Sequence, residues 1–482
     1  TIMLAMITTT SKSIMKINKT QLKLHKTMIR RVIYMLLLIV APSTLFAQSA
    51  SSIYFIDKNP IRHELNPAFA TEKGYFSFPF FGSMSFETQT NLGLSSVLYP
   101  YEGGLTTFLN SSIPSSTAMD AFDTNNIFNA NFKLPLISFG FNKWGGFNTF
   151  GSSIKVSSQT VIPYDMISIM KVGMTNPTDN YYDLSSLSFN TTAYGEVYFG
   201  HSREILPGLR VGAKVKMLLG VANISAQFEN FDVNLSEDLW RISNTGTLTV
   251  NGATLEYDED GLISDIDEFN AGLNGFGLAF DLGATYKVFD ELTVAASITD
   301  LGYIKWNGEY TSIAQSQAEP FEFTGFENIT TGEVEEDDEN SLDNQIESLS
   351  EDISNLFSFY QEKMGVSTTS NRTAMLRVSG EYAFLDNFVS VGLLSTTSFG
   401  SSIWTDLMAS VICRPADWFT VAVNGSVSNL GTGCGATVSF NLDRFNLYVG
   451  ANTMTLKFTP QGVPIGTTSM ALNFGVNFML EK

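Results

Sequence analysis

The sequence has few of the residues from which catalytic and metal sites are built. Its 482 residues include three histidines and two cysteines, and charged residues make up only 16%. His63 and His201 show no metal-ligand spacing, and neither a Gly-x-Ser-x-Gly elbow nor a phosphate-binding loop is present. We therefore expect no enzyme and no catalytic residues.

Long apolar runs are also missing. No stretch of about 20 apolar residues follows residue 50, so a helical membrane protein is not expected. Acidic residues outnumber basic ones, 48 to 28, and the net charge of −20 argues against nucleic acid as a partner. The chain is nevertheless 44% hydrophobic and contains 38 Gly and 38 Phe. This balance suits a protein whose outer surface contacts something other than water.

The N-terminal region resembles a secretion signal. A basic segment, Met28 to Arg31, precedes a short apolar stretch from Val32 to Ala41. A cleavage site after Ala47 completes the pattern, so residues 28–47 are predicted to be a signal peptide. Residues 1–27 are interpreted as a non-native extension. The alternative is a cytoplasmic arm before a membrane anchor, for which the apolar stretch is too short.

Residues 471–480, close to the C-terminus, alternate strictly between apolar and small or polar side chains. One face of this segment is apolar, and the other is small, polar or sulfur-containing; the two sets are Leu472, Phe474, Val476, Phe478, Leu480 and Ala471, Asn473, Gly475, Asn477, Met479. A period of two indicates a β-strand. Similar segments of about ten residues recur backwards through the chain, long enough to cross a bilayer when tilted. A soluble sandwich would also alternate, but with shorter strands.

The predicted connections alternate between short and long. Short turns are expected at 143–146, 204–208, 289–291, 385–387, 414–417 and 443–444. Longer or variable ones are expected at 91–133, 161–186, 225–274, 307–371, 429–432 and 456–468, with a tight reversal near Gly400. The pattern predicts an all-β fold, a transmembrane antiparallel β-barrel of about 14 strands over residues 75–482. Short periplasmic turns would place both termini of the mature chain in the periplasm of the cell outer membrane.

Two further expectations follow from this barrel. Cys413 and Cys434 would lie near opposite ends of their strands, beyond disulfide reach, so both should be free thiols. The inward face would carry charge of both signs, at Glu196, Arg210, Lys214, Lys216, Asp281, Lys287, Arg377, Glu381 and Asp406. These charges could form ion pairs across the lumen or line a selective pathway.

Three segments carry a family resemblance. They are Leu65-Asn66-Pro67-Ala68-Phe69, the stretch Gly277 to Tyr286, and Ser297 to Tyr303 ending at Trp306. Together they resemble the long-chain fatty-acid transporter (FadL) superfamily, within an uncharacterised Bacteroidota branch related to the PorV-like barrels that assist type IX secretion. The resemblance implies a 14-stranded barrel closed by an N-terminal hatch, here residues 48–74, with Asn66, Pro67 and Ala68 as the hatch motif. An ordinary turn ahead of a strand is the alternative for this triplet.

The resemblance also implies hydrophobic ligands that enter from outside and leave sideways through a break in the wall. We therefore expect passive uptake of a hydrophobic or amphipathic small molecule. The alternative is a non-transporting subunit of an outer-membrane secretion or barrel-assembly complex, as the PorV-like relatives suggest. Expected partners are outer-membrane lipid and either such a small molecule or an outer-membrane protein complex.

Three predicted loop segments are further candidate sites. The predicted loop 91–133 is rich in apolar residues that could contact a ligand or partner, or pack on one another; they include Leu98, Tyr99, Tyr101, Leu105, Phe108 and Leu109. Glu256, Asp258, Asp260 and Asp267 follow the spacing of a calcium loop, and the alternative is a polar hairpin tip. Residues 307–362 hold fifteen acidic and no basic residues, and their apolar stripe from Leu342 to Leu356 has helical spacing.

Overall fold

The computed structural model describes most of one compact unit, Ala47–Lys482. The described residues are 53–258, 261–270, 272–316, 320–326, 329, 341, 344–346, 348–349, 359–400, 402–453 and 469–480. Within these ranges no helix is both long and apolar enough to cross a membrane. The short helices are η2 (Pro60–Glu64), α2 (Leu94–Val97), α3 (Ser115–Met119), α4 (Tyr164–Lys171) and η3 (Gly308–Tyr310).

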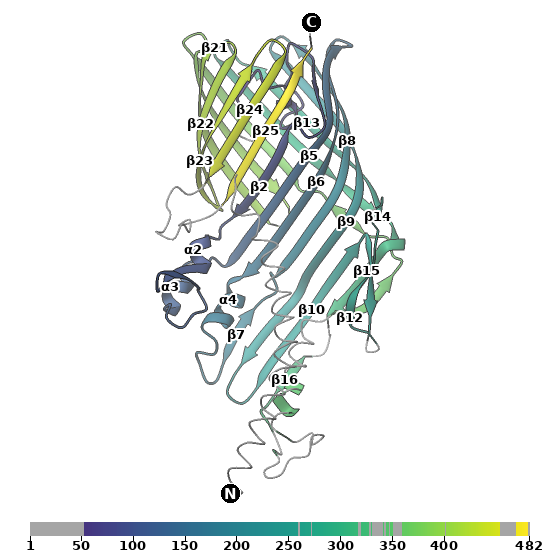
Figure 1. Ribbon diagram of the computed structural model, residues 1–482, viewed down its shortest axis with the longest axis vertical. Coiled ribbons are helices and arrows are strands. Elements are labelled where there is room, and N and C mark those ends of the chain that lie inside the picture. The colour runs from purple at the N-terminus through teal and green to yellow at the C-terminus, as the bar shows by residue number, and fades with distance from the viewer. Residues whose placement is uncertain are drawn as a thin grey trace. The chain divides into compact units, whose positions relative to one another are not determined.

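The strands form a closed antiparallel wall of fourteen staves, which confirms the predicted fold class (Figure 1). The first stave is broken into β1 (Tyr75–Ser77) and β2 (Met84–Thr90), and both parts pair with the last stave, β25 (Met470–Met479). The staves between them are, in order, β5 (Asn125–Lys143), β6 (Gly146–Pro163), β8 (Ser188–Leu206), β9 (Leu209–Leu235), β13 (Gly275–Lys287), β14 (Leu292–Trp306), β19 (Ala374–Phe384), β20 (Val389–Phe399), β21 (Ile403–Ala416), β22 (Phe419–Ser428), β23 (Gly431–Asn441) and β24 (Phe445–Thr453).

The two faces of the wall differ as the alternation predicts. Along β25 every second residue from Ala471 to Asn477 is buried toward the lumen, while the Leu, Phe and Val residues between them lie on the outer surface. Exposed apolar side chains continue around the wall, as at Leu407, Val423 and Val449. A closed antiparallel wall leaves no backbone edge unpaired, and its apolar outer face is favourable in lipid. The barrel therefore spans a membrane.

The connections separate the two ends of the barrel. Tight turns join β5 to β6, β8 to β9, β13 to β14, β19 to β20, β21 to β22 and β23 to β24 at one end, as predicted, and we call it the short-turn end. The opposite end, the long-loop end, carries two hairpins and an extension of the sheet. The hairpins are β3 (Leu98–Tyr101) with β4 (Gly104–Thr107), and β11 (Ala253–Tyr257) with β12 (Ile263–Phe269).

The predicted connection 307–371 is confirmed as the link between β14 and β19, and it contains only short strands of its own. The predicted connection 225–274 ends correctly before β13 but begins too early, because β9 continues to Leu235. β9 runs for 27 residues and extends past the wall, where it pairs with β10 and β7. This outer sheet comprises the end of β9 with β7 (Asn180–Asp183), β10 (Trp240–Asn251), β15 (Thr311–Ser316), β16 (Phe321–Phe323) and β17 (Phe359–Met364), while β18 (Thr369–Asn371) extends the wall beside β14. The buried apolar residues of this sheet, such as Phe231, Val233 and Val250, are too few to mark its strands with the regular alternation that reveals a stave.

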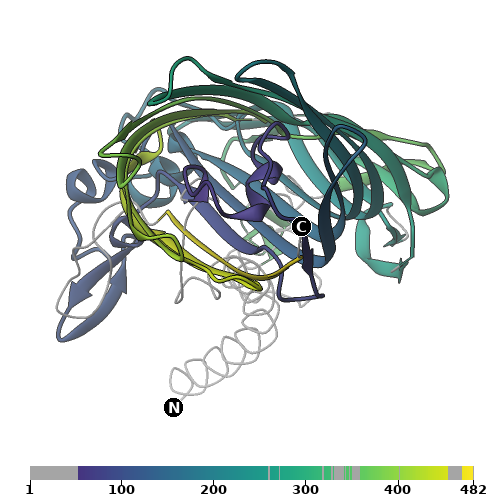
Figure 2. The same ribbon diagram turned by 90° about the horizontal axis from the view of Figure 1, so that it is seen from above.

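The segment before the first stave lies inside the barrel. We call the described part of it, residues 53–74, the plug segment. Figure 2 shows it in purple within the ring of strands. Ile53, Tyr54, Phe55, Ile56 and Ile61 are all buried, and they cluster with inward residues of the wall. The plug is thus held by an apolar core of its own as well as by the polar contacts described below.

The cysteines are free, as predicted. Cys413 lies on β21 and Cys434 on β23, and neither forms a disulfide. Cys413 pairs with Val421 near the short-turn end of β22, and Cys434 pairs with Gly425 farther along the same strand. The strand register therefore keeps the two thiols at different levels of the wall.

Candidate functional site

The Asn66-Pro67-Ala68 triplet docks the plug on two wall strands. Asn66 is fully buried, and its side-chain amide donates to the carbonyls of Ala284 (3.3 Å) and Ala296 (3.2 Å). Its amide oxygen accepts from the backbone N–H of Ala68 (2.9 Å), which turns the chain at Pro67. One side chain therefore bridges β13, β14 and the plug backbone.

Two wall glycines make room for this contact. A Cβ at Gly283 would lie 2.0 Å from Asn66 Oδ1, and one at Gly212 would lie 2.2 Å from the Pro67 carbonyl oxygen. Real side chains do not tolerate such approaches, so the plug backbone reaches the wall only because these positions lack a Cβ. Gly283 lies within the stretch Gly277 to Tyr286 that carries the family resemblance. The sequence alone does not connect Gly283 or Gly212 with the triplet.

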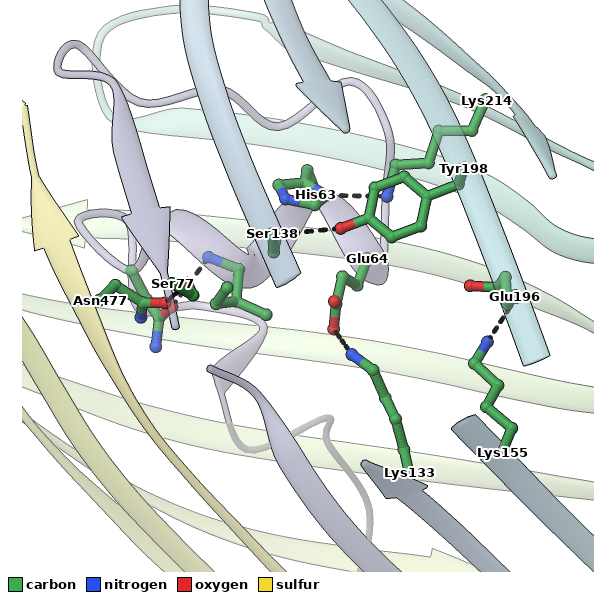
Figure 3. A network of polar contacts seen from close by, with 12 residues as sticks. His63, Glu64, Ser77, Lys133, Ser138, Lys155, Glu196, Tyr198, Lys214 and Asn477 are labelled. Atoms are coloured by element: carbon green, nitrogen blue, oxygen red, sulfur yellow. Dashed lines mark hydrogen bonds and ion pairs between the residues drawn. The ribbon is translucent and has the colours of Figure 1, made fainter. Parts of the chain in front are cut away.

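A chain of buried polar groups continues from the plug into the wall (Figure 3). Lys214 Nζ donates to His63 Nδ1 at 2.7 Å, and His63 Nε2 contacts the Tyr75 hydroxyl. Because an ammonium can only donate, Nδ1 accepts and Nε2 carries the proton that it donates to Tyr75. Ser138 Oγ lies 2.7 Å from the Tyr75 hydroxyl and 3.0 Å from that of Tyr198.

His63 is held in its neutral form by this environment. Burial lowers the pKa of His63 well below its usual range, and the neighbouring Lys214 ammonium lowers it further. The adjacent plug residue, Glu64, forms an ion pair with Lys133 of β5. The plug therefore contacts β5, β9, β13 and β14 through polar groups, of which the Glu64–Lys133 pair is matched in charge, whereas Lys214 faces the neutral His63.

Of the charges predicted to face inward, Glu196, Lys216, Asp281 and Glu381 form ion pairs, which confirms that alternative for these four. Lys287 pairs with Asp290 at an exposed turn. The rest take part in none of the ion pairs formed by the described residues; they are Arg210, Lys214, Arg377 and Asp406.

Lys216 lies 2.7 Å from both Asp281 and Asp300, and Lys155 lies 2.8 Å from Glu196. Arg414 pairs with Glu381 at 3.0 Å. Asp300 has a φ of 60° at a bulge between β13 and β14, and this left-handed backbone is tolerated by Asp.

This cluster gives a role to two segments singled out by their family resemblance. Asp281 accepts a hydrogen bond from the backbone N–H of Asp300 (2.8 Å), so the two aspartates are joined directly as well as through Lys216. Neither Asp300 nor Lys155 was among the predicted inward charges. The bulge hides Asp300 from a strict period of two, whereas Lys155 lies on a strand whose apolar face is weakly marked.

A cavity of about 180 Å³ lies in the lumen next to these ion pairs. Its lining includes apolar contributions from Phe132, Val156, Met375 and Trp404. The polar lining comes from several strands and includes Ser85, Glu87, Gln89, Asn129, Asn131, Lys133, Lys155, Ser157, Gln159, Tyr194, Asp300 and Arg372. Most of its lining residues are polar, yet apolar atoms provide about half of the lining surface.

Some polar atoms at this cavity have no protein partner among the described residues. They are Gln89 Oε1, Asn129 Oδ1 and Arg372 Nε. Gln89 donates its Nε2 to Glu87 at 2.9 Å, so its amide oxygen is the free end. Arg372 stacks on the Tyr194 ring at 4.2 Å and donates to its hydroxyl. The cavity lining thus contains two free hydrogen-bond acceptors, Gln89 Oε1 on β2 and Asn129 Oδ1 on β5. It also contains the Arg372 cation, which lies between β18 and β19 in the chain.

The first stave is interrupted beside this cavity. Eight residues separate Phe76 from Met84, but their partners on β25, Phe478 and Phe474, are only four residues apart. Residues 78–83, which contain the four surplus positions, leave the regular ladder and retain only scattered hydrogen bonds, such as Val476 N–H to Phe81 O at 2.6 Å. Phe78, Phe80 and Phe81 are each about half exposed.

The interruption and the cavity meet at one register position. Ser85 is the second residue of β2 and follows the interruption closely. It pairs with Lys133 of β5, and both residues line the cavity. Lys133 is also the residue that pairs with Glu64 of the plug. Lys133 therefore contacts the plug, lines the cavity and lies beside β2 of the broken stave.

The predicted apolar loop is divided between packing and exposure. β5 begins at Asn125, so the loop is shorter than the predicted 91–133. Phe108 is buried against Ala118, Met119 and Ile167, with Tyr99 at the margin of the same cluster. Leu98 is half-buried in β3, whereas Tyr101, Leu105 and Leu109 are exposed. The self-packing alternative thus holds for part of the set, and a ligand or partner role for the rest stays a prediction.

The predicted calcium segment forms the β11–β12 hairpin. Glu256 pairs with Asp265 across it, and Asp258 Oδ1 accepts from the Leu262 N–H at the tip (2.8 Å). No group of three or more acidic, His or Cys residues suited to a metal occurs within the described part of the chain. Asp260 and the Asp267 side chain lie outside it, so calcium stays a prediction. Most of the apolar stripe 342–356 also lies outside the described residues, so its helix stays a prediction too.

The comparisons with known proteins add a fold likeness and a family. Among curated proteins no match to this sequence is found. The chain is similar to the toluene transporter TbuX of Ralstonia pickettii, with 10% identity and a TM-score of 0.40 over 91% of this chain and 96% of that one. It is also similar to the toluene transporter TodX of Pseudomonas putida (9% identity, TM-score 0.38, 91% and 95% covered). A FadL homologue of Pseudomonas aeruginosa gives 11% identity and a TM-score of 0.35, with 91% and 95% covered.

A family model covers most of the wall and begins within the plug triplet. Residues 67–452 match the model described as a family of unknown function, DUF5723. The matched range runs from Pro67 through thirteen of the fourteen staves, ending in β24. The chain therefore belongs to the DUF5723 family.

Proposed function

We propose that this protein is an outer-membrane channel for passive uptake of an amphipathic small molecule. The short-turn end would face the periplasm, so that the plug and both ends of the mature chain lie there. The observation that carries the proposal is the meeting of the lumen cavity with the broken first stave at Ser85 and Lys133. A ligand in the cavity would lie next to the one stave whose ladder is interrupted.

The cavity chemistry supports a ligand with a polar head rather than a plain hydrocarbon. Gln89 Oε1 and Asn129 Oδ1 require hydrogen-bond donors, and Arg372 Nε requires an acceptor. A hydroxylated or zwitterionic head group supplies both. The lysines beside it are already neutralised by Glu64 and Glu196, so a simple anion gains little from them. Phe132, Met375 and Trp404 offer contacts to a short apolar part.

The broken stave supports a sideways exit. Residues 78–83 close the wall with few ladder bonds, and a segment with few backbone bonds opens more easily than a regular strand. Their exposed phenylalanines lie on the lipid side, where an apolar chain leaving the lumen would meet them. The plug leaves the short-turn end filled, which favours exit through the wall over exit along the barrel axis.

Repairing the first stave tests this proposal. Deleting Pro79–Gly82 removes the four residues that are surplus to the β25 register and should give a continuous strand. The matched control deletes Ser236–Leu239, the four-residue hairpin tip that joins β9 to β10. Both variants should retain the heat-modifiable gel mobility of a folded barrel.

The readout is uptake of dansyl-undecanoic acid by cells that express each variant. We expect wild type and the hairpin deletion to take up this fluorescent amphiphile alike, and the stave deletion to fall at least tenfold, which corresponds to about 1.4 kcal/mol of barrier. A folded stave deletion that transports at the wild-type rate would show that the interruption is not the exit.

A non-transporting role in an outer-membrane complex is the second candidate. It is favoured by the outer sheet, because β10 and β15–β17 extend beyond the wall and contribute nothing to the lumen cavity. Gentle detergent extraction separates the two candidates. A stoichiometric protein partner that is lost when β15–β17 are replaced by a short turn would favour this role, whereas a monomer active in dansyl-undecanoic acid uptake would exclude it.

A further inference from the structure

A second hollow lies outside the lumen. It has a volume of about 420 Å³ and lies over the long-loop ends of β13 and β14. The side chains that give it its character are Leu273, Phe276, Leu278, Tyr303, Lys305 and Ser367. This outer groove is separate from the plug and from the broken stave, because none of its residues belongs to either.

Strand geometry places the groove at one boundary of the membrane. The outward residues of β13 from Tyr286 to Phe276 form an exposed, largely apolar row. Ten residues at about 3.3 Å each, tilted by about 40°, rise about 25 Å, which equals the apolar height of a barrel in a bilayer. Phe276 is therefore the last apolar residue of the row, and Lys305 is its direct partner on β14.

The groove combines an apolar wall with one cation. Phe276, Leu278 and Tyr303 are all more than a third exposed, so they offer their faces to an acyl chain. Lys305 is exposed and takes part in none of the ion pairs formed by the described residues. The Ser367 side chain lies at the same groove. In a protein with a net charge of −20, an unpaired cation at the membrane boundary is an attractive position for a phosphate.

We propose that this outer groove binds a membrane lipid with an anionic phosphate head group. The phosphate lies against the Lys305 ammonium and the Ser367 hydroxyl, and an acyl chain lies along Phe276, Leu278 and Tyr303. The groove is continuous with the lipid-facing surface of the wall. In a bilayer, lipid molecules surround this surface, so a lipid is the occupant that the groove meets first. Charge complementarity selects an anionic lipid over a zwitterionic one.

Native mass spectrometry of the full chain tests the proposal. The protein is released from nanodiscs that contain equal amounts of phosphatidylglycerol and phosphatidylcholine, and the retained lipid is identified by mass. We expect wild type to retain phosphatidylglycerol over phosphatidylcholine by about tenfold, the size of one charge-assisted hydrogen bond. Lys305→Glu should bring the ratio to about one, and Lys305→Arg should preserve most of it.

A matched charge reversal and a free ion complete the design. Lys363→Glu changes the same charge on β17 of the outer sheet, away from the groove, and should leave the ratio unchanged. Added inorganic phosphate should not displace the lipid, since it cannot make the apolar contacts. The proposal is overturned if Lys305→Glu retains phosphatidylglycerol as wild type does, if Lys363→Glu lowers the ratio equally, or if inorganic phosphate displaces the lipid. Transport assays play no part in this test, so it stands or falls apart from the proposed channel.

Discussion

At the scale of single residues, the plug is held by contacts that depend on exact side-chain size. Asn66 Nδ2 reaches two wall carbonyls because Gly283 presents no Cβ beneath it. A polar side chain that makes three hydrogen bonds in a buried place is costly to displace. The Asn-Pro-Ala triplet therefore acts as an anchor whose receptor is a pair of glycines on β9 and β13.

A methyl group at Gly283 should loosen this anchor. Gly283→Ala would place a Cβ 2.0 Å from Asn66 Oδ1 and 2.9 Å from Pro67 Cδ, an overpacking that typically costs about 1–3 kcal/mol. We expect the plug to become sensitive to protease while the barrel keeps its heat-modifiable mobility. Gly380→Ala on β19 is the control, because its Cβ would meet nothing within 4 Å. Equal protease resistance in the two variants would contradict the docking role.

The neutral state of His63 predicts a pH dependence of plug docking. Its folded pKa is lowered by burial and by Lys214, so the unfolded plug binds more protons below the ordinary histidine pKa of about 6.5. Docking stability is then complete above about pH 6.5 and falls by about 1.4 kcal/mol per unit as the pH drops below it. The other charged groups nearby are Lys133, Lys216 and Glu64.

This dependence is measured by limited proteolysis of the plug at pH 7.5 and 5.5. Wild type should be cut faster at the lower pH. His63→Gln should remove most of the difference between the two pH values, and His201→Gln, outside the plug, should not. A pH effect of the same size in all three proteins would assign it to the carboxylates instead.

At the scale of elements, the apolar loop before β5 behaves as a small core of its own. Phe108 packs with Ala118, Met119 and Ile167 from α3 and α4, so the loop and the helix after β6 stabilise each other outside the wall. Such a satellite cluster can unfold without the barrel. The exposed β3–β4 hairpin, which includes Tyr101 and Leu105, packs against this cluster through Tyr99.

Removing the central ring should unfold the cluster alone. Phe108→Ala deletes a buried aromatic side chain, which typically costs about 3–5 kcal/mol. We expect new protease sites within residues 91–124, with unchanged thermal unfolding of the barrel. Leu105→Ala is the control, because its side chain is already exposed. Loss of barrel stability in Phe108→Ala would show that the loop is part of the wall's folding unit.

At the scale of the whole molecule, the last stave closes the barrel. β25 pairs with β24 on one side and with both parts of the first stave on the other. A wall without it would have two open edges, and unpaired backbone groups are strongly unfavourable in lipid. A chain that ends at residue 468 should therefore give no heat-modifiable band on a gel, whereas removal of Glu481 and Lys482 alone should leave the band intact. A folded band from the shorter chain would disprove closure by β25.

Much of the fold could be predicted from the sequence, and much of the site could not. The fourteen staves, the short turns and the free thiols follow from the period of two and from strand length. Asp300 was not predicted because a bulge breaks that period. The outer sheet was not predicted because its buried apolar residues, such as Phe231, Val233 and Val250, are too few to mark its strands with a regular alternation. Gly212 and Gly283 show no role in the sequence, because only the fold places Pro67 beside Gly212 and Asn66 beside Gly283.

The sequence by itself determined that this chain is a membrane barrel, because the alternation from Ala471 to Leu480 makes one face of each strand apolar and local pattern decides which face meets lipid. The tertiary structure alone decided what fills the lumen. Three features join residues that are 19 to 84 positions apart: the Lys133–Glu64 pair, the Asp281–Lys216–Asp300 cluster, and the contact of the cavity with the broken stave at Ser85 and Lys133. Such contacts depend on the stagger of staves around the barrel, and strand register is a property of the closed wall rather than of any one segment.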